Sequence, residues 1–421
     1  MQSASNVRTV VFVENGIGYG GAVVCMRYLV RALDRTRFRP VVVTGRRGGA
    51  YEALSDDAEW HCFRDQRLDV DRLRAALQRS GLIGRWRLLD AIAGQLLARL
   101  DDLVNFLPCF VQTLWFLLRR RPALVHVNNE PLCNRAAILA AALLRIPVVA
   151  HVRGELQGSW LMRRLYRLPR RFIPVSQWVG ENIARLGVDR DRITQSYDGL
   201  ELARLDVGAD GRAWRERFDL PADAFLVGLV GLLIPWKGQQ LLLDALERLM
   251  PRVPNLYGLM IGGTPDECAG YEDLLRARVE ALPWRERVVF TGHVSNLSAT
   301  YNALDIVLSA STSPEPLGTV VIEGLALGRA VVAPRHGGAL EMIEDGRTGF
   351  LFEPGSAEDL ARVIDRLYRD PALRRSVGAA ARASALQRFS IEKHAAEVQA
   401  VYEQVLDGDR PTPTSQALTA R

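Results

Sequence analysis

The sequence has little cysteine and no long uninterrupted apolar run. Its five cysteines form no Cys-x-x-Cys pair, so the 421 residues indicate neither a zinc site nor a disulfide framework. The longest apolar run, 104–118, contains Asn105, Pro108 and Gln112 and is shorter than the roughly 20 residues that a membrane span needs. We therefore predict that 104–118 is a core helix and that the protein works in a reducing cytoplasm.

A secretory signal and a strong charge imbalance are also missing. Residues 1–9 are polar, and the apolar run that follows them is interrupted by Glu14 and by glycines. The formal net charge is only +6, but arginines cluster in 160–171, where Trp160 and Tyr166 stand among them. Such a face is either solvated or able to lie on an anionic membrane. The predicted location is the cytoplasm. The alternative is peripheral contact of this basic N-terminal domain with the inner face of the plasma membrane.

The chain is too long for one ordinary hydrophobic core and fits two domains of roughly 200 residues. Strand-then-helix patterns begin near residue 7 and begin again near residue 224, which predicts the α/β class with two Rossmann-like domains. We place the N-terminal domain at 1–203, the second domain at 204–388 and a closing amphipathic helix within 389–407. Residues 408–421, rich in Pro, Thr and Ser, are predicted to be a disordered tail.

A glycine-rich segment follows the first predicted strand, 7–13. Gly16, Gly18 and Gly21 match the pattern Gly-x-Gly-x-x-Gly, after a strand and before a helix, as a dinucleotide fingerprint requires. The next strand, however, ends in Gly-Arg-Arg at 45–47 and lacks the acidic residue that a NAD ribose needs. We expect these glycines to let the backbone approach a phosphate, with a plain tight turn as the alternative.

Polar residues follow two further predicted strands of the first half. The strand 123–127 ends in His126-Val-Asn128, and the strand 146–150 is followed by His151-Val-Arg153-Gly-Glu155. Functional groups gather beyond the carboxyl ends of parallel strands, so these five side chains are candidate site residues. A single histidine at such a place is more often a structural residue.

In the second half, a predicted strand at 224–231 leads into the turn 235–238 and a helix at 239–250. Lys237 stands in that turn, next to Gly238, where a flexible ammonium group can reach a phosphate.

The stretch 309–338 carries the strongest functional signal of the sequence. It predicts the end of a buried strand, a loop stiffened by two prolines, and a helix that begins near Gly318. The free amides at a helix start attract an anion such as a diphosphate. Glu315 and Glu323 can accept hydrogen bonds from sugar or ribose hydroxyls, and a nucleotide sugar carries all of these groups in one molecule.

The run from Glu315 to Gly349 resembles the donor-site signature of a large retaining glycosyltransferase family, family 4, with its E-x7-E motif. That family has the GT-B fold and includes sucrose synthases and bacterial mannosyl- and glucosyltransferases. The similarity lies in Glu315-Pro-Leu-Gly-Thr-Val-Val-Ile-Glu323 and in the later Gly337-Gly338; it is dense over 224–355 and weak over 46–120. The resemblance implies two Rossmann-like domains that face each other across a cleft, with the last helix crossing back to the N-terminal domain.

The resemblance also implies roles for single residues. Glu315 would position the hydroxyls of the donor sugar, and His151 matches a strand-end histidine that lies beside that sugar in the family. The donor would be bound by Gly20, Gly21, Lys237, Gly318, Thr319 and Glu323. Contacts to the acceptor or to phosphate are expected from Arg153, Glu155 and Asn128. The family needs no metal, and the nucleoside-diphosphate sugar is a co-substrate, so no cofactor is expected.

The chain departs from the family pattern at two positions. Leu232 stands where the family has an arginine, so one cationic contact to the diphosphate is missing or comes from elsewhere, with Arg153 as a candidate. Val152 stands where an aspartate often follows the histidine. Both departures put full activity in question.

We therefore predict a metal-independent retaining hexosyltransferase that uses a nucleotide sugar and a glycan or lipid-linked acceptor, in bacterial cell-surface polysaccharide or glycolipid synthesis. Three alternatives remain: a dehydrogenase, a GT-B nucleotide-sugar epimerase, and a catalytically silent GT-B binding subunit. The donor sugar and base, the acceptor and the linkage cannot be predicted from these residues. No nucleic-acid partner is expected.

Overall fold

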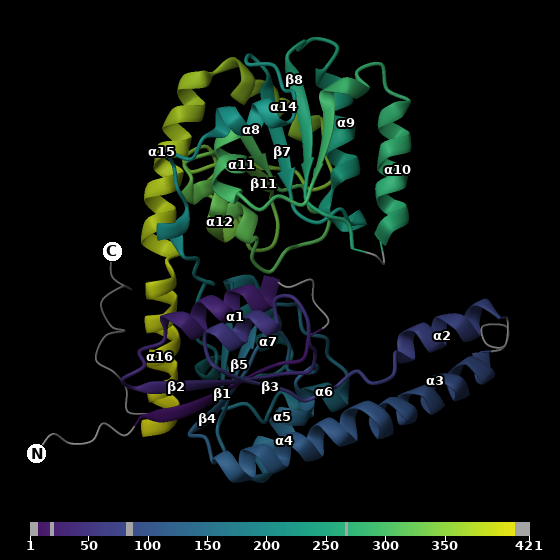
Figure 1. The fold of residues 1–421 in the computed structure, drawn as a ribbon, viewed down its shortest axis with the longest axis vertical. Helices are drawn as coiled ribbons and strands as arrows, with labels where there is room; N and C mark the ends of the chain where they lie inside the picture. The colour runs from purple at the N-terminus through teal and green to yellow at the C-terminus, as the bar shows by residue number, and fades with distance from the viewer. Residues whose placement is uncertain (1–6, 17–20, 81–86, 266–267, 409–421) are drawn as a thin grey trace, which may run out of the picture. The chain divides into compact units, whose positions relative to one another are not determined.

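The structure, a computed structural model, describes residues 7–16, 21–80, 87–265 and 268–408. Its contacts divide the chain into two compact units. Unit 1 consists of residues 1–175, 179–199 and 394–421, and unit 2 of residues 176–178 and 200–393. Both units are α/β structures (Figure 1). Among the described helices, none is both long and apolar enough to cross a membrane. Of the predicted tail, 408–421, only Gly408 lies within the described part of the chain.

Unit 1 is built on a parallel sheet of six strands in the order β3-β2-β1-β4-β5-β6. The strands are β1 (Arg8–Glu14), β2 (Phe38–Thr44), β3 (Glu59–Cys62), β4 (Leu124–Val127), β5 (Val148–Val152) and β6 (Arg171–Pro174). Apart from the edge strand β3, whose side chains are half-buried, most of their side chains are apolar and buried on both faces, as parallel strands covered by helices require.

The helices of unit 1 connect these strands and cover the sheet. They are α1 (Gly21–Ala32), α2 (Val70–Arg79), α3 (Arg87–Asp101), α4 (Leu107–Arg120), α5 (Arg135–Leu143), α6 (Trp160–Leu165) and α7 (Gln177–Arg185). A π-helical turn, η2 (Asp102–Phe106), joins α3 to α4 in one long helix. In Figure 1 this helix extends past the edge of the sheet, and α2 lies beside its α3 end.

Unit 2 has a second parallel sheet of six strands, in the order β12-β11-β10-β7-β8-β9. The strands are β7 (Phe225–Val230), β8 (Leu256–Ile261), β9 (Val288–Gly292), β10 (Ile306–Leu308), β11 (Ala330–Pro334) and β12 (Phe350–Phe352). Its helices are α8 (Gly211–Arg217), α9 (Gln239–Leu249), α10 (Ala269–Glu280), α11 (Leu297–Ala303), α12 (Thr319–Ala326), α13 (Ala339–Met342), α14 (Ala357–Arg369) and α15 (Pro371–Arg388).

The two sheets have the same topology. Numbered along the chain within each unit, both follow the order 3-2-1-4-5-6 of a doubly wound dinucleotide-type fold. The predicted α/β class with two Rossmann-like domains is therefore confirmed. In each sheet the direction of winding reverses between the first and fourth strands, β1 and β4 in unit 1 and β7 and β10 in unit 2. The loops that follow those strands diverge there and leave a crevice.

Two local predictions need correction. The strand that contains residue 150 extends to Val152, so His151 lies inside β5 opposite Ile173 of β6 and does not follow the strand. The segment 104–118 is only partly a core helix. Cys109, Phe116 and Leu117 are buried there, but Trp115 is 55% exposed.

The last helix, α16 (Ile391–Asp407), completes the core of unit 1. Its Val398, Val401 and Tyr402 pack in one cluster with residues of β1, α1, β2 and β4. The Tyr402 hydroxyl also forms a 2.7 Å hydrogen bond with Nδ1 of His126 in the middle of β4. Both side chains are fully buried, so this bond joins two groups that water cannot reach.

We predict that Tyr402→Phe lowers the free energy of unfolding by about 1–3 kcal/mol, because Nδ1 of His126 is then buried without a partner. Tyr257→Phe is the matched control, since Tyr257 is a half-buried strand residue of unit 2. Thermal and urea unfolding curves of the two variants measure the difference. Equal stability of both variants would contradict the structural importance of this bond.

Candidate active site

The candidate site of unit 2 lies at its topological switch point. The loop after β7 carries Lys237, and the loop after β10 carries Glu315. Lys237 Nζ lies 2.9 Å from Glu315 Oε2, and about a fifth of each side chain is exposed. The Ser311 hydroxyl donates a hydrogen bond to the other carboxylate oxygen of Glu315. The two residues that the sequence analysis selected from stretches almost 80 positions apart are thus direct neighbours.

Three glycines allow these loops to approach so closely. Gly238 has φ of +83°, and a Cβ atom there would lie 1.9 Å from the carbonyl oxygen of Ala310. Gly337 and Gly338 press in the same way against the backbone at Glu315 and Pro316, and the Gly338 amide donates a 2.8 Å hydrogen bond to the Glu315 carbonyl. Side chains at these positions would push the Glu315 loop away from Lys237.

Helix α12 begins directly beside the Glu315 carboxylate. Gly318 is its N-cap residue and has extended backbone angles, so it offers no side chain to cap the helix. A Cβ atom at Gly318 would lie 3.6 Å from Glu315 Oε2. The first amides of an α-helix have no partner within the helix, and they add the positive end of its dipole. Thr319 is the first residue of α12, so the two predicted positions stand at the start of this helix.

Glu323 lies one turn further along α12 and is tied to the core of unit 2. The hydroxyl of the fully buried Tyr301 donates a 2.5 Å hydrogen bond to Glu323 Oε2. Burial raises the pKa of Glu323 to about 7, although this hydrogen bond works in the opposite direction. Among the described residues, no hydrogen bond to the second carboxylate oxygen is found beside the one that Tyr301 donates to Oε2. Glu323 therefore changes charge close to neutral pH.

Leu232, which replaces the family's arginine, supplies no charge to this site. Its carbonyl accepts a 2.9 Å hydrogen bond from the Gln239 side chain and so helps to fix the start of α9. Arg153, the candidate replacement, is held elsewhere. Its guanidinium forms two hydrogen bonds, of 2.7 and 2.9 Å, with Asp198 in unit 1, and only 5% of its side chain is exposed.

In unit 1, Arg153 belongs to a buried polar chain that the sequence analysis found only in part. Arg153 donates to Asn128, and Asn128 donates to Glu14. Glu14 then accepts a 2.6 Å hydrogen bond from the Gly16 amide, which holds the start of the glycine-rich segment. Burial raises the pKa of Glu14 to about 7. Asn128 was predicted as a site residue, but Glu14 and Asp198 were missed because their partners are distant in sequence.

His151 lies in the same polar chain, packed among His126, His394 and Asp198. Its ring centroid is 5.3 Å from both other imidazoles, and its Nε2 is 3.6 Å from Asp198 Oδ1. Burial lowers the pKa of all three histidines. Nitrogen and oxygen atoms of His151, Asp198 and His394 all lie within 4.8 Å, but the Asp198 carboxylate is already paired with Arg153. With 1% of its surface exposed, His151 presents no ring atom to solvent, and its catalytic role stays a prediction.

The other predicted positions of unit 1 are Gly20, Gly21 and Glu155. Gly20 lies outside the described residues. Gly21 is exposed at the start of α1, and a Cβ atom there would meet nothing within 4 Å. Gly16 is the crowded position, because a Cβ atom there would lie 2.4 Å from the Asn129 side chain. Glu155 is exposed in the loop after β5.

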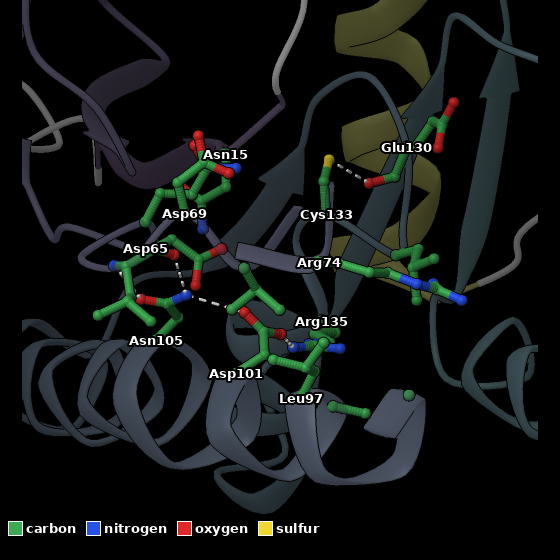
Figure 2. A pocket seen from close by; sticks show the side chains of 16 residues that line it. Asn15, Asp65, Asp69, Arg74, Leu97, Asp101, Asn105, Glu130, Cys133 and Arg135 are labelled. Carbon is green, nitrogen blue, oxygen red and sulfur yellow. Dashed lines mark hydrogen bonds and ion pairs between the residues drawn. The ribbon is translucent and has the colours of Figure 1, made fainter. Parts of the chain in front are cut away.

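A cavity of about 430 Å³ opens in unit 1 beyond the carboxyl ends of β1, β3 and β4. Figure 2 shows its polar side chains, which include Asn15, Asp65, Asp69, Asp101, Asn105, Glu130, Arg74 and Arg135. Arg135 pairs with Asp101 at 2.9 Å, and Asn105 donates to the same carboxylate at 2.8 Å. Burial raises the pKa of Asp65 and of Glu130.

Some acceptor groups of this cavity are not used by the protein itself. Oδ1 of Asn15 is buried and has no hydrogen-bond partner among the described residues. No hydrogen bond to the Glu130 side chain is found in that part of the chain either, and its backbone carbonyl accepts from Cys133 and Asn134. A buried acceptor without a partner costs free energy, so a hydroxyl group that donates to Asn15 Oδ1 would offset this cost, whereas the Glu130 carboxylate is only half-buried.

Comparisons with known proteins identify the family of the chain. A family model described as "Glycosyl transferases group 1" matches residues 210–384, and one described as "Glycosyltransferase Family 4" matches residues 19–204. A lipopolysaccharide core biosynthesis mannosyltransferase, LpcC, of Rhizobium leguminosarum is 30% identical over 69% of this chain and 81% of that protein. A GDP-mannose-dependent phosphatidylinositol monomannoside mannosyltransferase of Mycolicibacterium smegmatis is 29% identical over 66% and 73%.

Solved structures share the fold at lower identity. HepE of Anabaena, in complex with UDP and glucose, superposes with a TM-score of 0.77 at 23% identity over 94% of this chain and all of that one. A glycosyltransferase of Rickettsia africae gives 0.80 at 20% identity over 96% and 100%. The fold is therefore GT-B. From the two matched family models, the mannosyltransferase relative and the two doubly wound sheets, the chain belongs to the glycosyltransferases of group 1 and family 4.

Proposed function

We propose that the protein is a metal-independent, retaining hexosyltransferase, which moves a sugar from a nucleoside diphosphate to a glycan or lipid-linked acceptor. The observation that carries the proposal is the Lys237–Glu315 pair beside the uncapped start of α12, at the switch point of unit 2. The names of relatives support the hexosyl class, since one is a mannosyltransferase of lipopolysaccharide core biosynthesis. We propose that this reaction serves the synthesis of a bacterial cell-surface polysaccharide or glycolipid.

The parts of a nucleotide sugar correspond to the groups of this site. Lys237 and the first amides of α12 would bind the diphosphate, which draws Lys237 away from Glu315. The freed Glu315 carboxylate would accept hydrogen bonds from the sugar hydroxyls. Glu323 accepts a hydrogen bond from Tyr301 with Oε2. Its other carboxylate oxygen would accept a hydrogen bond from a ribose hydroxyl.

Transfer then requires little covalent chemistry from the protein. As the bond from the anomeric carbon to the diphosphate breaks, its electron pair passes to the phosphate oxygen, where Lys237 and α12 stabilise the charge. The acceptor oxygen bonds to the anomeric carbon from the same face, and its proton passes to the departing phosphate. We assign the positive charge that a metal would supply to Lys237 and the α12 amides.

The cavity of unit 1 is the proposed acceptor site. Its carboxylates and amides suit the hydroxyl groups of a sugar, and the surplus of Asp and Glu over Arg disfavours a polyanion at this place. Contact of the basic face at 160–171 with an anionic membrane remains part of the proposal, for an acceptor with a lipid anchor. Trp160 and Leu161 are 68% and 63% exposed there.

Glu315→Gln is expected to fold normally and to lower kcat by about 100-fold or more, because the amide neither pairs with Lys237 nor accepts as strongly from the sugar. Release of nucleoside diphosphate from UDP-, GDP- and ADP-sugars, with and without acceptor, is the measurement. Glu280→Gln, on the surface of α10, is the control. Unchanged turnover of the Glu315 variant refutes the assignment, and release that does not require an acceptor contradicts transfer.

The raised pKa of Glu323 gives a pH dependence whose sign can be worked out. The unfolded carboxyl ionises near its ordinary value of 4.5, whereas the folded one ionises at about 7, so ionisation costs folding stability progressively between these two values. Glu323→Gln removes a cost of up to about 3 kcal/mol. The variant should therefore gain stability over the wild type as the pH rises from 4.5 to 7, measured by urea unfolding. A constant difference over that range would contradict the buried carboxylate.

For the acceptor site, Glu130→Gln is expected to raise the acceptor KM by about tenfold and to leave the donor KM unchanged, since a hydrogen bond to a charged acceptor is weakened. Glu358→Gln, at the start of α14 in unit 2, serves as the control. Initial rates at varied donor and varied acceptor separate the two constants. A change in the donor KM alone would place the cavity outside the acceptor site.

A further inference from the structure

The long helix formed by α3, η2 and α4 exposes a continuous apolar stripe. We use the name apolar stripe for seven large side chains, each 46–66% exposed, which are Ile92, Leu96, Leu103, Leu107, Val111, Trp115 and Leu118. The opposite side of the same helix is buried, with Leu97, Asn105, Cys109 and Phe116 facing the protein. The helix therefore has two apolar faces, of which the protein covers only one.

The π-helical turn keeps the stripe on one side of the helix. From Leu103 to Trp115 the stripe advances in steps of four residues, and each such step drifts by about 40° around an α-helix. A π turn, with its i→i+5 hydrogen bonds, holds more residues per turn and rotates the following residues back. Because η2 lies in the middle of the stripe, it offsets the drift there.

The charge around the apolar stripe is positive. The stripe helix with its C-cap residue, 87–121, contains five arginines and three carboxylates, a net charge of +2, and unit 1 as a whole has 32 arginines and 22 carboxylates, a net charge of +10. Asp101 and Asp102, which lie on this helix, are ion-paired with Arg99 and Arg135. At the C-terminal end of the stripe, Arg119 is exposed and lies 4.0 Å above the ring of Trp115.

We propose that the apolar stripe is a docking surface for an anionic lipid bilayer, on which the long helix lies parallel to the membrane plane. Leucine, valine and tryptophan side chains along one face, with arginine beside them, are the composition of an interfacial helix. Tryptophan and arginine together suit the headgroup level. A second copy of the chain is a poorer partner, because two stripes packed together would bring two units of net charge +10 to one interface.

This inference deepens the proposed function, which already includes membrane contact at 160–171, by naming a second surface of unit 1, and its test does not depend on transfer activity. The test is flotation of the full chain with vesicles of phosphatidylcholine alone and of phosphatidylcholine mixed with phosphatidylglycerol, without donor or acceptor. We expect at least about tenfold stronger binding to the anionic vesicles, and weaker binding in 1 M NaCl, where the screening length falls to about 3 Å.

Leu103→Glu combined with Val111→Glu is expected to lower binding by about tenfold or more, because both side chains leave the lipid. The control is Leu274→Glu, since Leu274 is 53% exposed on α10 of unit 2. Circular dichroism establishes that each variant folds. If the double variant does not fold, Arg119→Glu decides the matter, with an expected loss of binding to the anionic vesicles only.

Three outcomes would overturn the proposal. The wild type fails to float with anionic vesicles, or the folded stripe variant binds as the wild type does. In the third, light scattering shows a dimer that the stripe variant converts to a monomer, without any vesicle binding, and the stripe is then an interface between two copies. In the second of these outcomes, loss of vesicle binding by the Trp160→Ser variant assigns the membrane contact to α6 instead.

Discussion

The reversal of winding in each sheet is the constraint on which the chemistry depends. In unit 2 the loops that follow β7 and β10 leave two adjacent strands toward opposite sides, so their residues meet without covering each other. Lys237 and Glu315 use that space, and the start of α12 adds backbone amides to it. The contact also requires glycine at 238, 337 and 338, because the loops touch through their backbones. The ion pair, the start of α12 beside it and the close backbone contact of the loops all follow from the reversal of winding between β7 and β10.

The two ionised groups of this site neutralise each other. An isolated lysine at a helix start would attract any phosphate, whereas Lys237 already has a carboxylate at 2.9 Å. A ligand must therefore replace the interaction of both partners at once, with an anion for the lysine and hydrogen-bond donors for Glu315. A nucleotide sugar offers both, and inorganic phosphate offers only the first. Under the proposed function, this requirement would select a nucleotide sugar over inorganic phosphate without a second cation at position 232.

Much of this arrangement was predictable from local patterns. Buried apolar runs located the strands β1, β2, β4, β5, β7 and β10, and proline and glycine around Glu315 located the loop and the start of α12. The predictions that failed concerned residues whose contacts are with residues distant in sequence. His151 looked like a strand-end residue because nothing near it in sequence shows that it pairs with Ile173 or packs against His394. Glu14 and Asp198 were missed for the same reason, and the exposed side of 104–118 cannot be told from its buried side by composition alone.

The position of α16 has a consequence for biosynthesis. The N-terminal unit needs Val398, Val401 and Tyr402 to close its hydrophobic cluster, and these residues are synthesised after those of unit 2. Unit 2 consists of residues up to Lys393, so its chain is complete before that of unit 1. During translation, the apolar residues of β1, α1, β2 and β4 that α16 covers therefore stay exposed until α16 has been synthesised. Such an exposed apolar surface is a binding site for a chaperone.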